Sequence, residues 1–275
     1  MTQTNLLLGQ TLHFSGNPMT TSWEDAVQID SDGGVLIKAD KIIAVGAAAA
    51  LRSAHPEACV HDYGDALLCP GFVDAHVHYP QTAIIASWGK RLIDWLNSYT
   101  FPEELRLADP DYAAQIAGRY LDLTLDHGTT TVRWHDKGRA RYAITPRFTP
   151  TSTPDQLAAL GALWAEHPDC LMQTHLSEQL DEIAWVRDLV PRARDYLDTY
   201  EEHGLIGERA LFGHAIHLEP REIDRLAETG AAVVHCPTSN TFIGSGLFDM
   251  AKIAARHIPI GLATDTGGGS SFSML

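Results

Sequence analysis

The sequence has few of the features that mark secreted, membrane-bound or nucleic-acid-binding proteins. Its 275 residues include only four cysteines and no CxxC pair, so we expect no disulfide framework. The longest apolar run, Ile42 to Leu51, is about half of the ~20 residues that a membrane span needs. The first residues carry no basic segment of the kind that begins a signal peptide. We therefore expect a cytoplasmic protein that does not bind membranes.

Positive charge is also scarce. There are 20 Lys and Arg residues against 35 Asp and Glu, and the net charge is −15. Because nucleic-acid backbones are bound by basic side chains, we expect no nucleic-acid partner. The 45% hydrophobic content is that of an ordinary folded protein. What stands out is histidine, which occurs 14 times.

Two regions differ in their hydrophobic pattern. Over residues 1–66, the short apolar runs Asn5–Phe14 and Gly34–Val45 are separated by Gly, Pro, Asp and Ser, which predicts a small N-terminal β domain. Over residues 67–275, strand and helix patterns alternate, and this favours a parallel α/β sheet. Strands are predicted at Ala66–Val77, Thr129–Val132, Tyr142–Phe148, Leu171–His175, Leu211–His214, Ala231–His235 and Ile258–Thr264.

Polar residues follow most of the predicted strands and decide between an open sheet and a barrel. An open sheet would spread them along one edge, whereas a barrel brings all strand ends to one mouth. We therefore predict a (β/α)8-type TIM barrel. The polar residues are His76, His78, Arg147, His175, His214, His235 and Asp265.

Histidine placement indicates a metal site. His76 and His78 alternate on one strand, so both imidazoles face the same side. His175 and His214 each end a strand, although either could be a hydrogen-bonded core histidine. Asp265 ends a buried strand, where a carboxylate is costly unless it is paired or metal-bound. Three imidazoles and one carboxylate suit Zn²⁺, with Fe²⁺ as the second choice.

Seven segments together resemble the amidohydrolase superfamily and, within it, the guanine deaminases. They are PGFVDAHVHYPQT, LIDWLNSYTFPEE, ITPRFTPTS, QTHLSE, FGHAIHL, HCPTSN and ATDTGGGSSFSML. The resemblance implies a zinc-dependent hydrolase that converts guanine to xanthine and ammonia, with one ion per chain. It also implies a small β-sandwich domain beside the barrel, a purine as the small-molecule partner and a homodimer.

The resemblance also implies roles for individual residues. The metal ligands would be His76, His78, His175 and Asp265. The catalytic residues would be Glu178 as proton shuttle, His214 as the group that orients water, and Asp265. The purine would be held by Gln81, Arg147, Phe148 and Glu178, with Asp94 and Trp95 in a covering loop.

The barrel pattern is interrupted between Val132 and Tyr142. Nine residues separate the two predicted strands, whereas a parallel crossover needs about a dozen or more. Only seven strands are predicted, and a barrel of this type has eight. We therefore expect an incomplete barrel that lacks a segment near residues 132–142, and a C-terminus shorter than in the family. Two alternatives stay open: an aminohydrolase acting on another purine, a pyrimidine or a triazine, and a catalytically impaired remnant.

Overall fold

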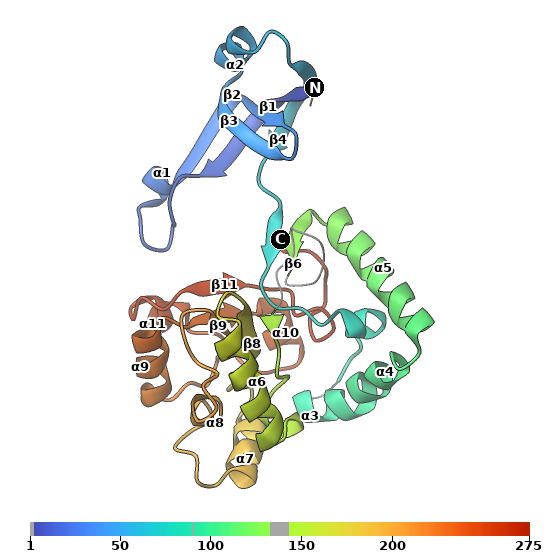
Figure 1. Ribbon diagram of the computed structural model, residues 1–275, viewed down its shortest axis with the longest axis vertical. Coiled ribbons are helices and arrows are strands. Elements are labelled where there is room, and N and C mark those ends of the chain that lie inside the picture. The colour runs from blue at the N-terminus through green and yellow to red at the C-terminus, as the bar shows by residue number, and fades with distance from the viewer. Residues whose placement is uncertain (1–2, 90, 133–142) are drawn as a thin grey trace. The chain divides into compact units, whose positions relative to one another are not determined.

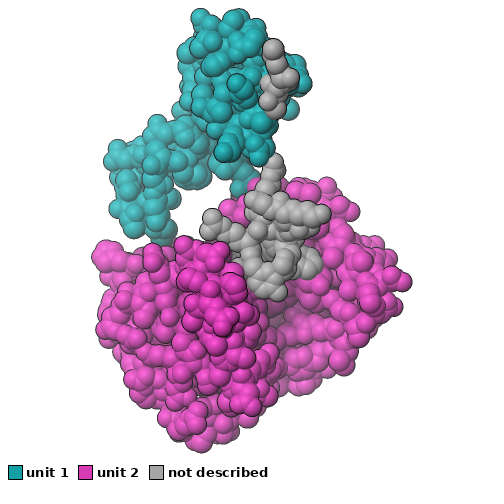
Figure 2. All heavy atoms as spheres, viewed as in Figure 1, with its two compact units in different colours: residues 1–71 teal, residues 72–275 magenta. Residues whose placement is uncertain are grey.

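The computed structural model describes residues 3–89, 91–132 and 143–275. They belong to two compact units, residues 1–71 and residues 72–275 (Figure 2). No helix among these described residues is long and apolar enough to cross a membrane.

The first unit is a four-stranded sheet in the order β3-β2-β1-β4. Strand β1 is antiparallel to β2 and parallel to β4, and β2 is antiparallel to β3. Leu6, Leu8, Leu36 and Ala48 form its small core. The single apolar run predicted at 34–45 is in fact parts of two strands, because the chain turns at Ala39, which has φ of 58°. The elements are β1 (Thr4–Phe14), α1 (Trp23–Ala26), β2 (Val27–Lys38), β3 (Lys41–Ala47), α2 (Ala48–Ala54) and β4 (Cys59–Leu68).

The second unit alternates strands and helices, as the sequence predicted (Figure 1). Its strands are β5 (Phe72–Asp74), β6 (Thr129–Val132), β7 (Ala143–Ile144), β8 (Leu171–Leu176), β9 (Ala210–His214), β10 (Ala232–His235) and β11 (Ile260–Leu262). Its helices are η1 (Tyr79–Ile84), α3 (Leu92–Trp95), the π-helical η2 (Leu96–Thr100), α4 (Phe101–Arg106), α5 (Pro110–Asp126), η3 (Thr149–Thr151), α6 (Pro154–Glu166), α7 (Leu180–Leu189), α8 (Asp198–Glu201), α9 (Pro220–Thr229), α10 (Pro237–Phe242) and α11 (Met250–Ala254).

The strands of this unit form a parallel series. Five pair in the order β11-β10-β9-β8-β7, and β5 pairs with β6. Backbone hydrogen bonds extend β5 alongside β11: Ala75 N donates to Leu262 O at 3.2 Å, and Asp265 N donates to His76 O at 3.1 Å. The buried Asp74 carboxylate strengthens this junction by accepting from Thr264 N at 3.0 Å. Neighbouring strands therefore run in the order β6-β5-β11-β10-β9-β8-β7.

Helix termini follow local sequence signals. The Thr153 side chain accepts from Gln156 N at the start of α6, with Pro154 in the first turn, as the predicted cap requires. Helix α9 ends at Gly230, whose φ of 70° favours glycine. The main core lies between β8, β9, β10 and helices α6, α7 and α9, around side chains such as Met172 and Phe212 that are fully buried.

Two predicted strands were wrong in extent. The run Ala66–Val77 is not one strand, because β4 ends at Leu68 and β5 begins at Phe72; Pro70 between them has no N–H to donate to a ladder. The strand predicted at Tyr142–Phe148 pairs only at Ala143–Ile144, and Pro146 breaks it in the same way. The expected deletion near residues 132–142 falls almost wholly outside the described residues.

Candidate active site

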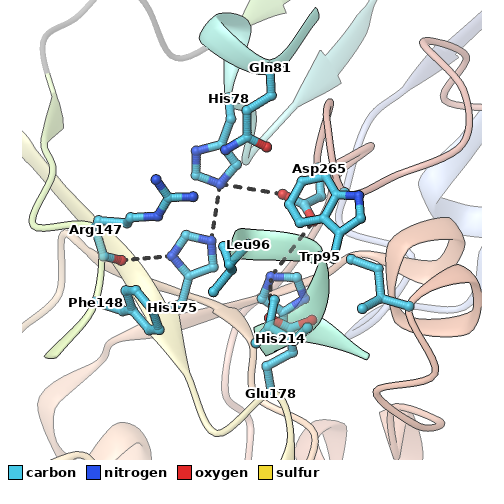
Figure 3. Close-up of a pocket in the computed structure, with 13 residues that line it drawn as sticks. His78, Gln81, Trp95, Leu96, Arg147, Phe148, His175, Glu178, His214 and Asp265 are labelled. Atoms are coloured by element: carbon cyan, nitrogen blue, oxygen red, sulfur yellow. Dashed lines mark hydrogen bonds and ion pairs between the residues drawn. The ribbon is translucent and has the colours of Figure 1, made fainter. Parts of the chain in front are cut away.

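Most of the polar residues predicted at strand ends lie together at one end of the parallel series (Figure 3). His235 does not line the pocket shown in Figure 3; its ring stacks on Phe248. His76 and His78 follow β5, and Asp265 follows β11. His175 lies near the end of β8 and His214 ends β9, where the register pairs His214 with Leu176. Parallel neighbours end on the same side, so side chains far apart in sequence converge there.

Three imidazole nitrogens meet at contact distance. The Nε2 atoms of His76, His78 and His175 lie 3.0–3.2 Å from one another. Asp265 Oδ1 is 3.4 Å from His78 Nε2 and 3.6 Å from His76 Nε2. Within the described part of the chain, these four residues form a group whose ligand atoms all lie within 4.8 Å of one another.

The chemistry of this group fits a metal ion. The Nδ1 atom of His175 is 2.7 Å from Arg147 O, and since a carbonyl only accepts, Nδ1 carries the proton and Nε2 presents its lone pair. Burial, with the neighbouring histidines as further causes, holds the pKa values of His175 and His78 well below the usual range, so both rings are neutral. Converging lone pairs repel one another unless a cation lies between them, and neutral imidazoles with one carboxylate are ligands that Zn²⁺ accepts.

A buried acid and an imidazole stand beside this group. Glu178 Oε2 lies 3.5 Å from His214 Nε2, and His214 Nδ1 lies 2.8 Å from Asn240 Oδ1. Burial lowers the pKa of His214, but the carboxylates of Glu178 and Asp265 and the Asn240 hydrogen bond outweigh it, and the net pKa is raised. Burial likewise raises the pKa of Asp265 to about 7. The Asp265 carboxyl can therefore exchange a proton near neutrality.

Backbone strain is concentrated here. His214 has φ of 65° and Asp265 has φ of 50°, a left-handed conformation that costs free energy for residues other than glycine. Such strain persists where surrounding structure holds it, and it is common at functional sites.

A pocket of about 360 Å³, including some open solvent, lies over the cluster. One wall is apolar and comes from α3, η2 and the loops near Phe148 and Ile243. Of the nine residues predicted as metal ligands, catalytic residues or purine-binding residues, eight line the pocket, and the ninth, His76, belongs to the metal-ligand group beneath. The lining residues are His78, Gln81, Leu92, Trp95, Leu96, Arg147, Phe148, His175, Glu178, His214, Ile243, Asp265 and Gly268.

The prediction of Asp94 and Trp95 in a covering loop was right only for Trp95. Trp95 lines the pocket, but from a helix rather than a loop, and Asp94 beside it is exposed.

Two residues of the site were not predicted. Asn240 and Ser245 hold His214 and Glu178 through hydrogen bonds. Their only sequence signal is their position just after the HCP motif, which carries no recognisable ligand spacing.

Comparison with known proteins gives matches over most of the chain. The Amidohydrolase family matches residues 67–142 and 134–275. A second family, the Imidazolonepropionase-like composite domain of bacteria, matches residues 33–58. The two amidohydrolase matches overlap at residues 134–142, where the sequence pattern is interrupted.

Individual relatives agree with this family. Guanine deaminase from Escherichia coli (strain K12) is 36% identical over 307 residues, which cover 91% of this chain and 70% of the relative. Its solved structure superposes with a TM-score of 0.93 at 34% identity and covers 98% of this chain and 76% of its own. A probable guanine deaminase from Deinococcus radiodurans is 37% identical over 325 residues, covering 96% and 74%.

A further solved structure, guanine deaminase from C. acetobutylicum with bound guanine in the active site, superposes with a TM-score of 0.87 at 26% identity. The match covers 99% of this chain and 77% of the C. acetobutylicum chain.

The aligned stretches of 307 and 325 residues in the E. coli and D. radiodurans relatives exceed the 275 residues of this chain. The relatives therefore contain residues inside the aligned region that have no counterpart here.

Proposed function

The chain belongs to the amidohydrolase family, and we propose that it is a guanine deaminase, which hydrolyses guanine to xanthine and ammonia. One observation carries the proposal: the four-residue group His76, His78, His175 and Asp265 lies under a pocket that also has a buried acid and an apolar wall. The guanine deaminases at 36% and 37% identity support this substrate over other aminated heterocycles.

We propose that this group holds one Zn²⁺, with Fe²⁺ as the alternative. A divalent ion there would supply Lewis acidity, which would lower the pKa of a coordinated water towards ~7. His175 is oriented for this task because its Nδ1 donates to Arg147 O at 2.7 Å, the kind of supporting contact that fixes a ligating imidazole.

Glu178 is the proposed proton shuttle. Deamination forms a C2–O bond from water and breaks the C2–N bond. One of the two water protons reaches a ring nitrogen and the other reaches the departing ammonia. Oε1 of Glu178 accepts a hydrogen bond from Ser245 at 2.7 Å, which leaves Oε2, 3.5 Å from His214 Nε2, to carry the proton. His214, held by Asn240, orients the attacking water.

Gln81, Arg147 and Phe148 are the proposed purine-binding residues. The guanidinium of Arg147 can donate to a carbonyl oxygen, and the ring of Phe148 presents an aromatic face to a flat heterocycle. Phe148 packs against His175 with ring centroids 6.0 Å apart, so a base stacked there lies beside the metal-ligand group.

We further propose that the parallel series is an incomplete (β/α)8 barrel. Seven strands are described, β6 and β7 do not pair with each other within the described residues, and the family match divides into two overlapping parts between them. Residues 1–66 would form part of a composite β-sandwich and residues 67–275 the barrel domain; the composite-domain match at 33–58 supports the first assignment. A cytoplasmic homodimer acting in purine catabolism completes the proposal.

Purified full-length protein loaded with stoichiometric zinc tests the function directly. We expect release of ammonia and formation of xanthine from guanine, and product formation slower by a factor on the order of 10²–10⁴ in the matched variant Glu178→Gln. Turnover of cytosine, adenine or melamine without turnover of guanine would show that the substrate assignment is wrong. Protein that binds zinc but acts on none of them would instead identify an impaired remnant.

A further inference from the structure

A single carboxylate behind the pocket holds two of its polar side chains. Glu104, in α4, accepts a hydrogen bond from Gln81 Nε2 through Oε1 at 2.8 Å. Its other oxygen, Oε2, accepts from Arg147 Nη1 and forms an ion pair with the guanidinium. Phe101, one helical turn earlier, lies under the same guanidinium, with Cζ 5.5 Å from the ring centroid. Helix α4 therefore holds Arg147 at two points.

The bond to Glu104 determines which way the Gln81 amide faces. A carboxylate accepts hydrogen bonds, so the NH₂ group of the amide must point to Glu104 and Oε1 must point elsewhere. Gln81 is only 1% exposed, lines the pocket, and its Oε1 is buried without a hydrogen-bond partner among the described residues. An unsatisfied buried acceptor costs free energy, which a ligand N–H would recover. Gln81 thus offers the pocket an acceptor.

Arg147 offers the opposite polarity. Its guanidinium carries five N–H donors and no acceptor, and Glu104 engages Nη1. The Glu104 carboxylate also balances the positive charge of Arg147, so the pair carries no net charge towards a ligand. Figure 3 shows the side chains of Gln81 and Arg147 near His78. A fixed acceptor and fixed donors therefore stand at one side of the pocket.

We propose that Glu104 is a positioning residue that makes the pocket select a neutral cyclic lactam over a 6-aminopurine. In a lactam such as the 6-oxopurine edge, a ring N–H stands beside a carbonyl, which matches an acceptor beside donors. A 6-aminopurine reverses this order and would set a ring-nitrogen lone pair against Gln81 Oε1 and an amino group against Arg147. A site built around directed hydrogen bonds rejects the wrong pattern strongly, because its own polar groups are left unpaired. This inference rests on the proposed function, since it says that the pocket recognises guanine by its lactam edge.

The variant Glu104→Gln tests the inference. A glutamine amide has one acceptor and one donor, so it can serve Gln81 or Arg147 but not both. Isothermal calorimetry with full-length protein would compare hypoxanthine, a lactam without a 2-amino group, with adenine. We expect wild type to bind hypoxanthine at least tenfold more tightly than adenine, and Glu104→Gln to lose most of that preference.

The control is Glu103→Gln, on the same helix. Glu103 accepts from Arg106 and Tyr112 instead of from the pocket residues, so this change probes helix stability alone and should keep the preference. With guanine as substrate, Glu104→Gln should raise KM about tenfold or more and change kcat by less than threefold. The inference is wrong if Glu104→Gln keeps the preference for hypoxanthine, or if Glu103→Gln loses it equally.

A double-mutant cycle with Gln81→Met provides a second readout. If Glu104 acts through Gln81, the loss of hypoxanthine affinity in the double variant will be smaller than the two single losses combined. Additive losses would contradict the inference. If wild-type protein deaminates guanine and Glu104→Gln behaves like wild type, only the proposed role of Glu104 is wrong. Wild-type protein that neither binds hypoxanthine nor deaminates guanine overturns the proposed function itself.

Discussion

The hydroxyl of Ser245 donates its only proton to Oε1 of Glu178 at 2.7 Å. It cannot donate elsewhere without breaking this bond, and its oxygen already accepts from Gln179 Nε2 at 3.1 Å. The Gln179 amide is oriented in turn because its Oε1 accepts from Leu92 N at 3.3 Å. The donor and the acceptor of each hydrogen bond in this series are thus fixed, from Leu92 in the pocket wall to Glu178.

The variant Ser245→Ala should lower kcat about tenfold with little change in KM, because Glu178 loses the contact that keeps Oε1 an acceptor and Oε2 the proton carrier. Ser245→Thr, which keeps the hydroxyl, is the matched control and should retain most of the activity. Steady-state kinetics with guanine measures both. Wild-type kcat in Ser245→Ala would rule out this orienting role.

Glu178→Gln should keep the metal but lose on the order of 10²–10⁴ in kcat, as is typical when a general acid–base group is removed. His175→Ala should lose the metal as well as the activity, since His175 belongs to the convergent group. Elemental analysis of the two purified variants separates these outcomes. An empty site in Glu178→Gln would make Glu178 a metal ligand and not a shuttle.

Removal of the metal should abolish activity and lower the thermal midpoint of unfolding. Three imidazole nitrogens 3.0–3.2 Å apart have no favourable arrangement without a cation, and a ligand that binds only the folded state stabilises it. Calorimetry before and after chelation, followed by addition of zinc, should show the loss and its reversal. His175→Ala serves as control, and a zinc-induced rise in its midpoint equal to that of wild type would count against the assigned ligands.

The candidate metal ligands could be predicted because each carries a signal in its own local sequence, whereas the roles of Gln81, Arg147, Phe148 and Glu178 came from the family resemblance alone. His76 and His78 show the period of a strand, and Asp265 is a carboxylate where an apolar residue belongs. Glu104 and Ser245 carry no such signal, since they act by holding other side chains and an acidic or hydroxyl residue in a surface-like segment is ordinary. The helical segment 92–106 was likewise missed, because Pro102 and the residues around Tyr99 are poor helix formers, and packing against the pocket stabilises it.

Stability should depend on pH through Glu222. Burial raises its pKa to about 7, although backbone N–H bonds from Glu219 and Leu197 oppose the shift. The folded state then binds the proton more tightly than the unfolded state, so the stabilisation is complete below about pH 4.5 and is lost as pH rises through about 7.

Urea unfolding of wild type and Glu222→Gln at pH 5 and pH 8 measures this effect. The two N–H groups donate to different oxygens of Glu222, so glutamine keeps an acceptor for one of them, and it does not titrate. The stability of wild type relative to the variant should fall by on the order of 1–3 kcal/mol between the two pH values. An equal difference at both would show that Glu222 does not titrate in this range.

Two helical glycines give opposite expectations for substitution by alanine. A Cβ at Gly161 in α6 would lie 1.8 Å from His203 O, which is backbone and cannot give way cheaply. A Cβ at Gly118 in α5 meets nothing within 4 Å. Gly161→Ala should therefore destabilise by about 2 kcal/mol or more, whereas Gly118→Ala should stabilise by up to ~1 kcal/mol. Chemical denaturation checks both, and equal effects would contradict the close approach of α6 to His203.

Because β5 pairs with β11 and the residues that follow it, the candidate metal site can be completed only late in translation. Asp74 and Thr264, which join the two segments, are 190 residues apart, and a ribosome makes the first long before the second. Until then β5 has no partner on that edge, and His76 and His78 stand without Asp265. The nascent chain therefore cannot hold a metal with the complete ligand set. The proposed metal can therefore acquire its complete ligand set only after β11 and Asp265 have been translated, when the contact of Asp74 with Thr264 closes a loop of 190 residues.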